Sequence, residues 1–153
     1  MIQRIQSVYL FLSSLAIYAL FLFPVVNIFS ALGAKKIMVT GVYEVINNQL
    51  AQTEPFTLLT IATVILGLIP LVLIFFFKNR KKQATLVYLN VVLVIGYSFW
   101  LAQTIKGASG KVLEISDYSI GAGLTSVSVL FLILAAKGIL RDEKLVKSAD
   151  RLR

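Results

Sequence analysis

The sequence predicts an all-α membrane protein built as a bundle of four transmembrane helices. Apolar residues make up 58% of its 153 residues, a larger share than soluble domains usually carry. They gather in four runs, at about 5–29, 57–77, 84–103 and 118–136, and a helix needs about 20 such residues to cross a hydrocarbon core of about 30 Å. The spans and their connections use the whole length, so we expect one membrane domain over residues 1–153.

The turn between the second and third spans predicts the orientation. Residues 78–83 read Lys-Asn-Arg-Lys-Lys-Gln, and short cytoplasmic loops carry an excess of Lys and Arg. With this turn inside the cell, both termini are inside as well, and most of the fifteen basic residues lie on the cytoplasmic side. The residues expected to fix this orientation, or to contact anionic lipid headgroups, are Lys78, Arg80, Lys81, Lys82, Arg141, Lys144 and Lys147.

The first apolar run extends from about Ile5 to Phe29, directly after Arg4. A cleaved signal peptide is the competing interpretation, but its apolar core would hold only roughly 7–15 residues. We therefore expect an uncleaved first span. Pro24, late in the run, is a candidate kink.

The loop over residues 30–56 is expected outside the cell. Its segment 36–40 is short and prone to form a strand. After Gly41, apolar residues recur at helical spacing over 42–50, which predicts a short helix lying on the membrane interface. Residues 53–55, Thr-Glu-Pro, are predicted to begin the second span, since Pro and Glu suit a first helical turn.

Polar and small residues within the second and third spans mark possible irregular points. Gly67 and Pro70 predict a kink in the second span, with a hinge as the alternative. Asn90 is the most polar group deep in any span, so its amide is expected to face a neighbouring helix and find a partner there; contact with a ligand is the alternative. Tyr97 and Trp100 suit an external aromatic belt.

The fourth span is rich in small residues that let helices approach closely. The strand-prone segment 111–115 before it is predicted to pair with residues 37–40, or at least to lie beside them, in a small external cap. After the span, residues 137–153 are predicted to continue as an amphipathic cytoplasmic helix on the anionic leaflet. The helix-packing candidates are Asn90, Ser119, Ala122, Gly123 and Ser126.

Several kinds of chemistry have no residues to support them. The chain has no Cys and no His, which excludes thiol chemistry, disulfides, Ser–His hydrolysis and the usual zinc sites. No charged residue falls within the predicted spans, unlike in ion-coupled carriers. We predict no catalytic, cofactor-binding or metal-binding residue and therefore no enzyme; catalysis by the external carboxylates is a remote alternative, since solvation and ion pairing with Lys36 or Lys111 explain them better. The net charge of +8 lies beside the apolar runs, where orientation explains it better than nucleic acid does.

Both ends of the chain carry specific patterns. Residues 1–10 (MIQRIQSVYL) and 141–153 (RDEKLVKSADRLR) resemble the ends of an uncharacterised family of small four-span inner-membrane proteins of Bacteroidota. The resemblance covers the full length and implies a multi-pass protein of the bacterial inner membrane. It implies no activity, because that family has none assigned.

These observations favour a non-enzymatic accessory or scaffolding subunit of a larger inner-membrane complex. Its partners would be membrane lipids and other integral membrane proteins. The alternative is a lipid-binding or small-molecule-binding protein, or a transporter component, with its site between Asn90 and the polar face of the fourth span.

Overall fold

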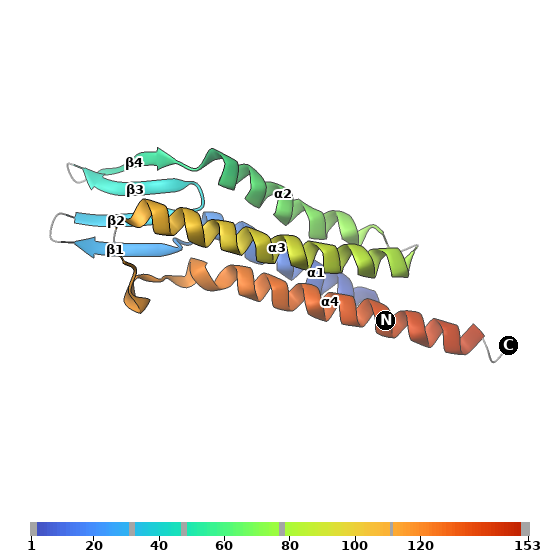
Figure 1. Cartoon of the computed structure of the whole chain (residues 1–153). Helices are drawn as coiled ribbons and strands as arrows, with labels where there is room; N and C mark the ends of the chain where they lie inside the picture. The colour runs from blue at the N-terminus through green and yellow to red at the C-terminus, as the bar shows by residue number, and fades with distance from the viewer. Residues whose placement is uncertain (1–2, 31–32, 47–48, 77–78, 111, 151–153) are drawn as a thin grey trace.

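Four helices lie side by side, and a four-stranded antiparallel sheet extends from one end of them (Figure 1). The computed structural model describes residues 3–30, 33–46, 49–76, 79–110 and 112–150. In chain order the elements are α1 (Gln3–Tyr18), the 3-10 helix η1 (Ala19–Phe21), β1 (Val26–Ser30), β2 (Gly33–Met38), β3 (Gly41–Ile46), β4 (Gln49–Pro55), α2 (Thr57–Ile74), α3 (Arg80–Ser109), the 3-10 helix η2 (Ile115–Asp117) and α4 (Ile120–Asp150).

The first helical segment is shorter than expected. The chain leaves η1 at Phe21, and Val26–Ser30 forms β1, so the expected span over 5–29 is wrong at its outer end. Pro24 lies between the two elements, where it disfavours helix for the residue before it and lacks an N–H for continuing one. Val26 and Ile28 beyond it are buried in a sheet, whereas Phe29 is exposed. Hydropathy alone does not separate such a strand from the end of a span.

The sheet follows chain order, β1-β2-β3-β4, with every neighbouring pair antiparallel. Val26 lies opposite Ile37, and Ile37 lies opposite Val42. All three side chains are buried, so one row across three strands packs onto the end of the bundle. This apolar row fixes the register, because a slip by one residue would turn it toward solvent.

Two expectations for the loop over 30–56 are wrong. Residues 42–50 were expected as an interfacial helix, but they belong to β3 and β4; the residues between these two strands lie outside the described chain. Residues 53–55 were expected to begin the second span, but they end β4, and α2 begins at Thr57. Pairing with the adjacent strand decides the structure here, whereas helical spacing within one segment does not.

The predicted pairing between residues 37–40 and 111–115 is also wrong. Both edges of β2 are occupied, by β1 and β3, and the connection between α3 and α4 contains η2. That loop reaches the sheet at the β1 edge, through an isolated bridge between Val26 and Tyr118 and a 3.0 Å bond from the Ser119 N–H to the Val25 carbonyl oxygen.

The described chain contains three helices that are long and apolar enough to cross a membrane, Thr57–Ile74, Arg80–Ser109 and Ile120–Val146, and a shorter apolar helix over Ile5–Phe21. The side chain of Asn79 caps α3 by accepting from the Lys82 N–H at 3.4 Å. Gly110 ends α3 with φ +67°, a left-handed conformation that suits glycine. As predicted, α4 continues without a break from the fourth apolar run into the charged tail.

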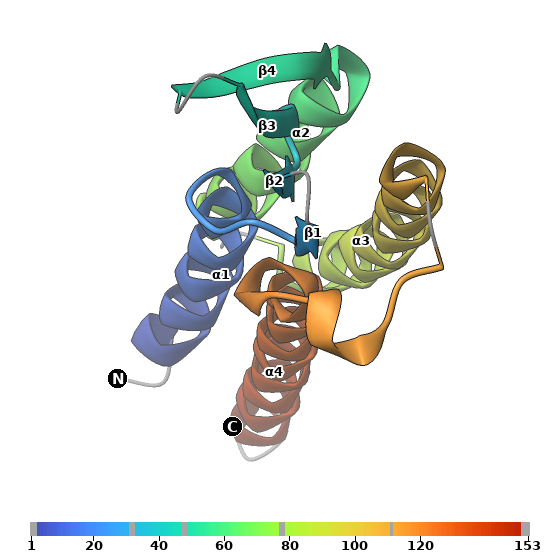
Figure 2. The ribbon, with the colours of Figure 1, turned by 90° about the vertical axis from the view of Figure 1, so that its left-hand side faces the viewer.

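The four helices contact one another in a ring. α1 packs against both α2 and α4, and α3 packs against α4, whereas α2 and α3 share the smallest interface among these neighbours. Seen from the sheet end, α1 and α4 stand close together while α2 and α3 stand apart (Figure 2). The interface between α2 and α3 is therefore the loosest of the four, while α1 packs closely against both of its neighbours.

Candidate functional site

Hydrogen bonds and close backbone contacts join α1 to both of its neighbours. The hydroxyl groups of Ser13 and Ser128 lie 2.8 Å apart, and both residues are fully buried. The Ser14 hydroxyl donates to the Gly67 carbonyl oxygen at 2.7 Å. The Tyr18 ring lies directly on Gly67, where an added Cβ would be 2.7 Å from the ring, so the absence of a side chain allows α1 and α2 to approach closely.

A buried carboxylate joins the start of α1 to the last part of α4. The Gln6 side-chain amide donates to Asp142 Oδ2, and both residues are buried. Asp142 Oδ1 has no hydrogen-bond partner among the described residues. This contact was not predicted, because residues 137–153 were assigned to a surface helix. The sequence does contain a pattern that indicates burial of this part of α4. Residues at three- and four-residue spacing follow one another on its buried face: Leu132, Ala135, Ile139 and Asp142.

Asn90 is buried as predicted, on the face of α3 that also carries Gln83 and Tyr97. These two neighbours reach α2: Gln83 Nε2 donates to the Leu73 carbonyl oxygen at 2.7 Å, and the Tyr97 hydroxyl lies 2.6 Å from that of Thr63. Neither polar atom of the Asn90 side chain has a hydrogen-bond partner within the part of the chain that the structure describes. The expected partner for this amide is therefore missing there.

The small residues of α4 do not all serve helix packing. A Cβ added at Gly123 would meet no described atom within 4 Å, whereas one at Gly121 would lie 2.5 Å from the Pro24 carbonyl oxygen. Within this chain, α4 therefore approaches another backbone segment closely at Gly121. The predicted close approach at Gly123 is wrong for the described residues. The Ser119 hydroxyl oxygen accepts a hydrogen bond from Asn27 Nδ2 at 3.4 Å.

The remaining candidates on α4 line a groove between α3 and α4. Its inner part, of about 240 Å³, is bounded by residues of α3, of α4 and of the sheet connection: Val25, Ser98, Leu101, Ala102, Ile105, Tyr118, Ala122, Thr125 and Ser126. Ser126 is exposed in this groove, whereas Ala122 lines it and is also partly packed against the core. Asn90 does not line this part of the groove, contrary to the site predicted between it and the fourth span.

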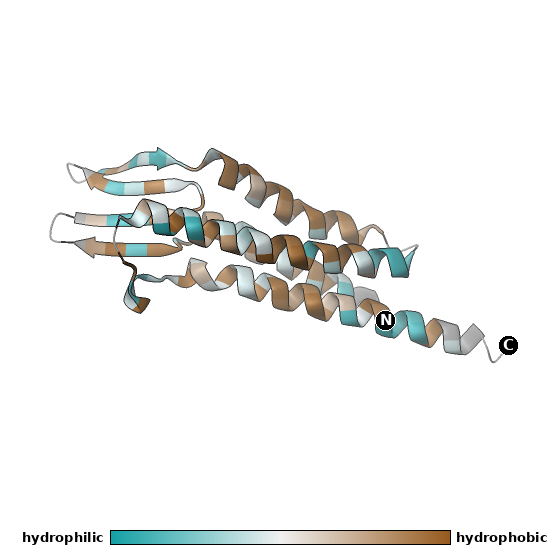
Figure 3. Cartoon of the chain, in the orientation of Figure 1, coloured by the Kyte–Doolittle hydropathy of each residue, from teal (hydrophilic) through white to brown (hydrophobic). Residues whose placement is uncertain are grey.

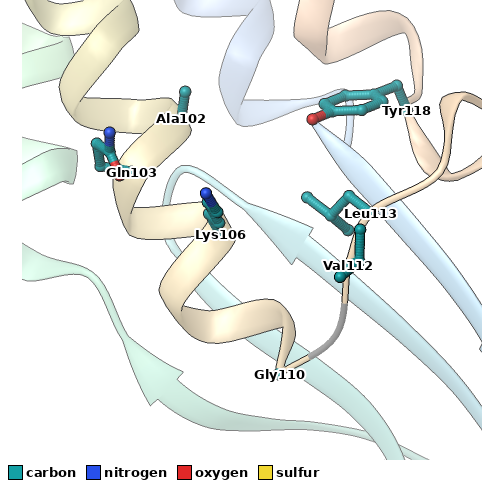
Figure 4. Close-up of a pocket in the computed structure, with 7 residues that line it drawn as sticks. All are labelled: Ala102, Gln103, Lys106, Gly110, Val112, Leu113 and Tyr118. Carbon is teal, nitrogen blue, oxygen red and sulfur yellow. The ribbon is translucent and has the colours of Figure 1, made fainter.

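An outer part of about 730 Å³ continues this groove toward the sheet. Its lining residues are Ala102, Gln103, Lys106, Gly110, Val112, Leu113 and Tyr118. Ala102 and Tyr118 line both parts, which makes them adjoining regions of one feature, here called the α3–α4 groove. Figure 4 shows the Lys106 side chain and the Tyr118 hydroxyl directed into the same space.

A second groove, here called the α2–α3 groove, lies on the other flank of α3. It has a volume of about 440 Å³, and its lining residues are Ala62, Ile65, Leu66, Ile69, Val92, Leu93, Gly96, Tyr97 and Trp100. Gly96 is exposed, and a Cβ there would meet no described atom within 4 Å. This groove is almost entirely apolar, whereas the α3–α4 groove carries an ammonium and several hydroxyl groups.

The basic residues predicted to fix the orientation gather away from the sheet. Arg80, Lys81 and Lys82 begin α3, and Arg141 and Lys144 are exposed on α4. Figure 3 shows hydrophilic residues at these ends of both helices. Lys78 and the Lys147 side chain lie outside the described residues.

The carboxylates at the sheet end of the described chain do not form a shared site. Glu44 pairs with Lys35 at 3.2 Å, not with the predicted Lys36. Asp117 Oδ2 accepts from the Glu114 N–H at 3.0 Å. Within the described ranges, no three His, Cys, Asp or Glu residues are grouped so that they could hold a metal ion.

A bundle of long apolar helices with a basic end and grooved flanks is the architecture of a helical membrane protein. The chain belongs to the family described as a domain of unknown function, DUF4293, whose model matches residues 2–152. The resemblance to an uncharacterised family is thereby confirmed, while its assignment to Bacteroidota stays a prediction. None of the curated proteins compared with the chain matches it.

Proposed function

We propose that the chain is a non-enzymatic accessory subunit of a larger complex in the bacterial inner membrane. It crosses the membrane four times, with both termini in the cytoplasm and the sheet outside. Two observations support four spans: α1 and η1 together rise about 30 Å, which matches the hydrocarbon core, and basic residues gather at the end of the bundle away from the sheet.

The proposed accessory role rests mainly on the α2–α3 groove. Its outward-facing small residues, Ala62 and Gly96, leave room for the backbone of another helix. Small residues at such a surface allow close helix approach, and van der Waals packing then supplies most of the association energy within lipid. The partner proposed for this groove is a transmembrane helix of another integral membrane protein.

Trp100 and the floor of the groove also favour a helical partner. Tyr97 and Thr63 are held together by their hydroxyl contact of 2.6 Å, so the groove has a fixed floor rather than mobile side chains. Trp100 lies at the end toward the sheet and is 44% exposed. A large, partly exposed aromatic ring beside a preformed groove is a frequent anchor of interfaces.

A pair of glycine substitutions tests this proposal. Gly96→Leu fills the α2–α3 groove, and Gly123→Leu makes the same change at another open position of the bundle. Because a Cβ added at either glycine would meet no described atom within 4 Å, both proteins should fold and reach the membrane. After solubilisation in mild detergent, a partner protein should co-purify in stoichiometric amount with the Gly123→Leu variant. It should not co-purify with the Gly96→Leu variant. Equal retention by the two variants would remove the groove from partner binding.

The orientation has a separate test. The chain has no Cys, so a single introduced cysteine reports its own side of the membrane. Glu44→Cys should react with an impermeant maleimide in intact cells, and Arg80→Cys should react only after lysis. The reverse pattern would place the sheet in the cytoplasm.

A further inference from the structure

We propose that the α3–α4 groove binds an anionic phospholipid from the leaflet on the sheet side. The lipid phosphate contacts the Lys106 ammonium and the Tyr118 hydroxyl, and the acyl region extends along the groove between the helices. This site is separate from the α2–α3 groove and does not require a protein partner.

Charge identifies the headgroup. Among the described residues, Lys106 is the charged one that lines the outer groove, and none of the described lining residues of either part is acidic. The nearby Asp117 is buried, with its carboxylate bonded to the backbone of its own segment. A Lys ammonium beside a phenolic hydroxyl supplies donors, and a phosphate oxygen accepts them.

The position of Lys106 suits the headgroup level of a bilayer. It lies near the end of α3, about 9 Å along the helix from Trp100, and Trp side chains favour the membrane interface. A Lys stem can lie along apolar surface while its ammonium reaches the phosphate region. The groove thus has its cationic end where lipid phosphates are found.

The inner groove suits the part of a lipid below its phosphate. From Lys106 to Ser98 the groove descends about 12 Å along α3. Leu101, Ile105 and Ala122 line it, together with the hydroxyl-bearing Thr125 and Ser126. Apolar walls bind an acyl chain, and hydroxyl groups can donate to ester carbonyl oxygens. A small hydrophilic anion uses neither feature.

Native mass spectrometry of the full chain, exchanged into mixed micelles of phosphatidylglycerol and phosphatidylcholine, tests the site. The wild type should retain one phosphatidylglycerol in preference to phosphatidylcholine. Lys106→Gln should lower that preference about fivefold, the effect of one cation near anionic lipid. Lys36→Gln is the matched control, since it removes an exposed Lys of β2 that lines neither groove, and it should keep the preference.

Two further variants keep the test decisive where Lys106→Gln proves unstable. Tyr118→Phe removes one hydroxyl and retains the ring and the backbone bridge to Val26, and it should weaken retention about fivefold. Ala102→Phe fills the junction of the two groove parts and should abolish retention. Unchanged lipid selectivity in folded Lys106→Gln or Tyr118→Phe protein would overturn the proposal. Complete displacement of the lipid by millimolar inorganic phosphate would also overturn it, by showing a site for the free anion.

Discussion

The two flanks of the bundle use the same kinds of residue in opposite ways. Around α1, Gly67 and Gly121 lie in contact with other parts of the chain, and the hydroxyl groups of Ser13 and Ser128 bond to each other. Around α3, a Cβ added at Gly96 would meet no described atom within 4 Å, and Ser126 faces a groove. Small residues therefore pack closely on the α1 flank, whereas they leave grooves on the α3 flank.

This difference separates residues that hold the fold from residues that remain for binding. A side chain added on the α1 flank must displace atoms of the chain itself, and its effect is on folding. A side chain added on the α3 flank enters empty space, and its effect is on whatever occupies that space. Single substitutions on either flank test whether its residues act in folding or in binding.

The largest effect on folding is expected from Gly121→Leu. The new Cβ would lie 2.5 Å from the Pro24 carbonyl oxygen, and backbone on both sides leaves no flexible atom to move. Folded protein should fall below detection in size-exclusion chromatography of the detergent extract. Gly123→Leu, two residues further on, should elute as the wild type does; a shared loss would show that any bulk on α4 is harmful.

Gly67→Ala should have the next largest effect. The added methyl group would lie 2.7 Å from the Tyr18 ring, and overpacking of this kind costs about 3 kcal/mol at the upper end. Thermal unfolding in detergent, followed by the fluorescence of Trp100, measures the loss. Adding Tyr18→Leu should recover part of it by removing the ring. Without such recovery, the contact between α1 and α2 would not be the cause.

Asp142→Ala should cost about 2 kcal/mol, because it leaves the buried amide of Gln6 without its partner. Asp142→Asn keeps an acceptor and should cost less. The same unfolding measurement compares the two. Equal stability of wild type and Asp142→Ala would mean that the contact between α1 and the tail of α4 contributes nothing.

Ser13→Ala should have the smallest effect. It removes the contact with Ser128, and interhelical hydrogen bonds within membranes contribute about 0.6 kcal/mol on average. The expected decrease in unfolding temperature is small but in the same direction. A decrease as large as that of Gly67→Ala would show that this hydroxyl pair, rather than glycine packing, seals the flank.

The helical part of the fold was predictable, because hydropathy over about 20 residues reports burial in lipid directly. The sheet was not. Val26, Ile37 and Val42 are buried only because three strands bring them together, and the sequence around Val42 also fits helical spacing. Strand pairing depends on two segments, so the sequence of either segment alone predicts a strand poorly.

The grooves were predictable only in part. The small face of the fourth span was recognised, but its division between Gly121 and Ala122, which pack against other residues, and Ser126, which is exposed in a groove, depends on the rotation of α4. Lys106 appeared as an ordinary loop cation, because α3 was expected to end at 103 and it continues to Ser109. Three-dimensional placement, not residue type, gives Lys106 its proposed role.

Site-specific photo-crosslinking in native membranes tests the open flank most directly. A benzophenone amino acid is introduced at Val92, which lines the α2–α3 groove, and at Leu15, an equally apolar and exposed position of α1. We expect a discrete protein adduct from position 92, lost in the Gly96→Leu background, and only lipid adducts from position 15. Protein adducts of equal yield from both positions, or only lipid from both, would contradict the assignment of partner binding to the α3 flank.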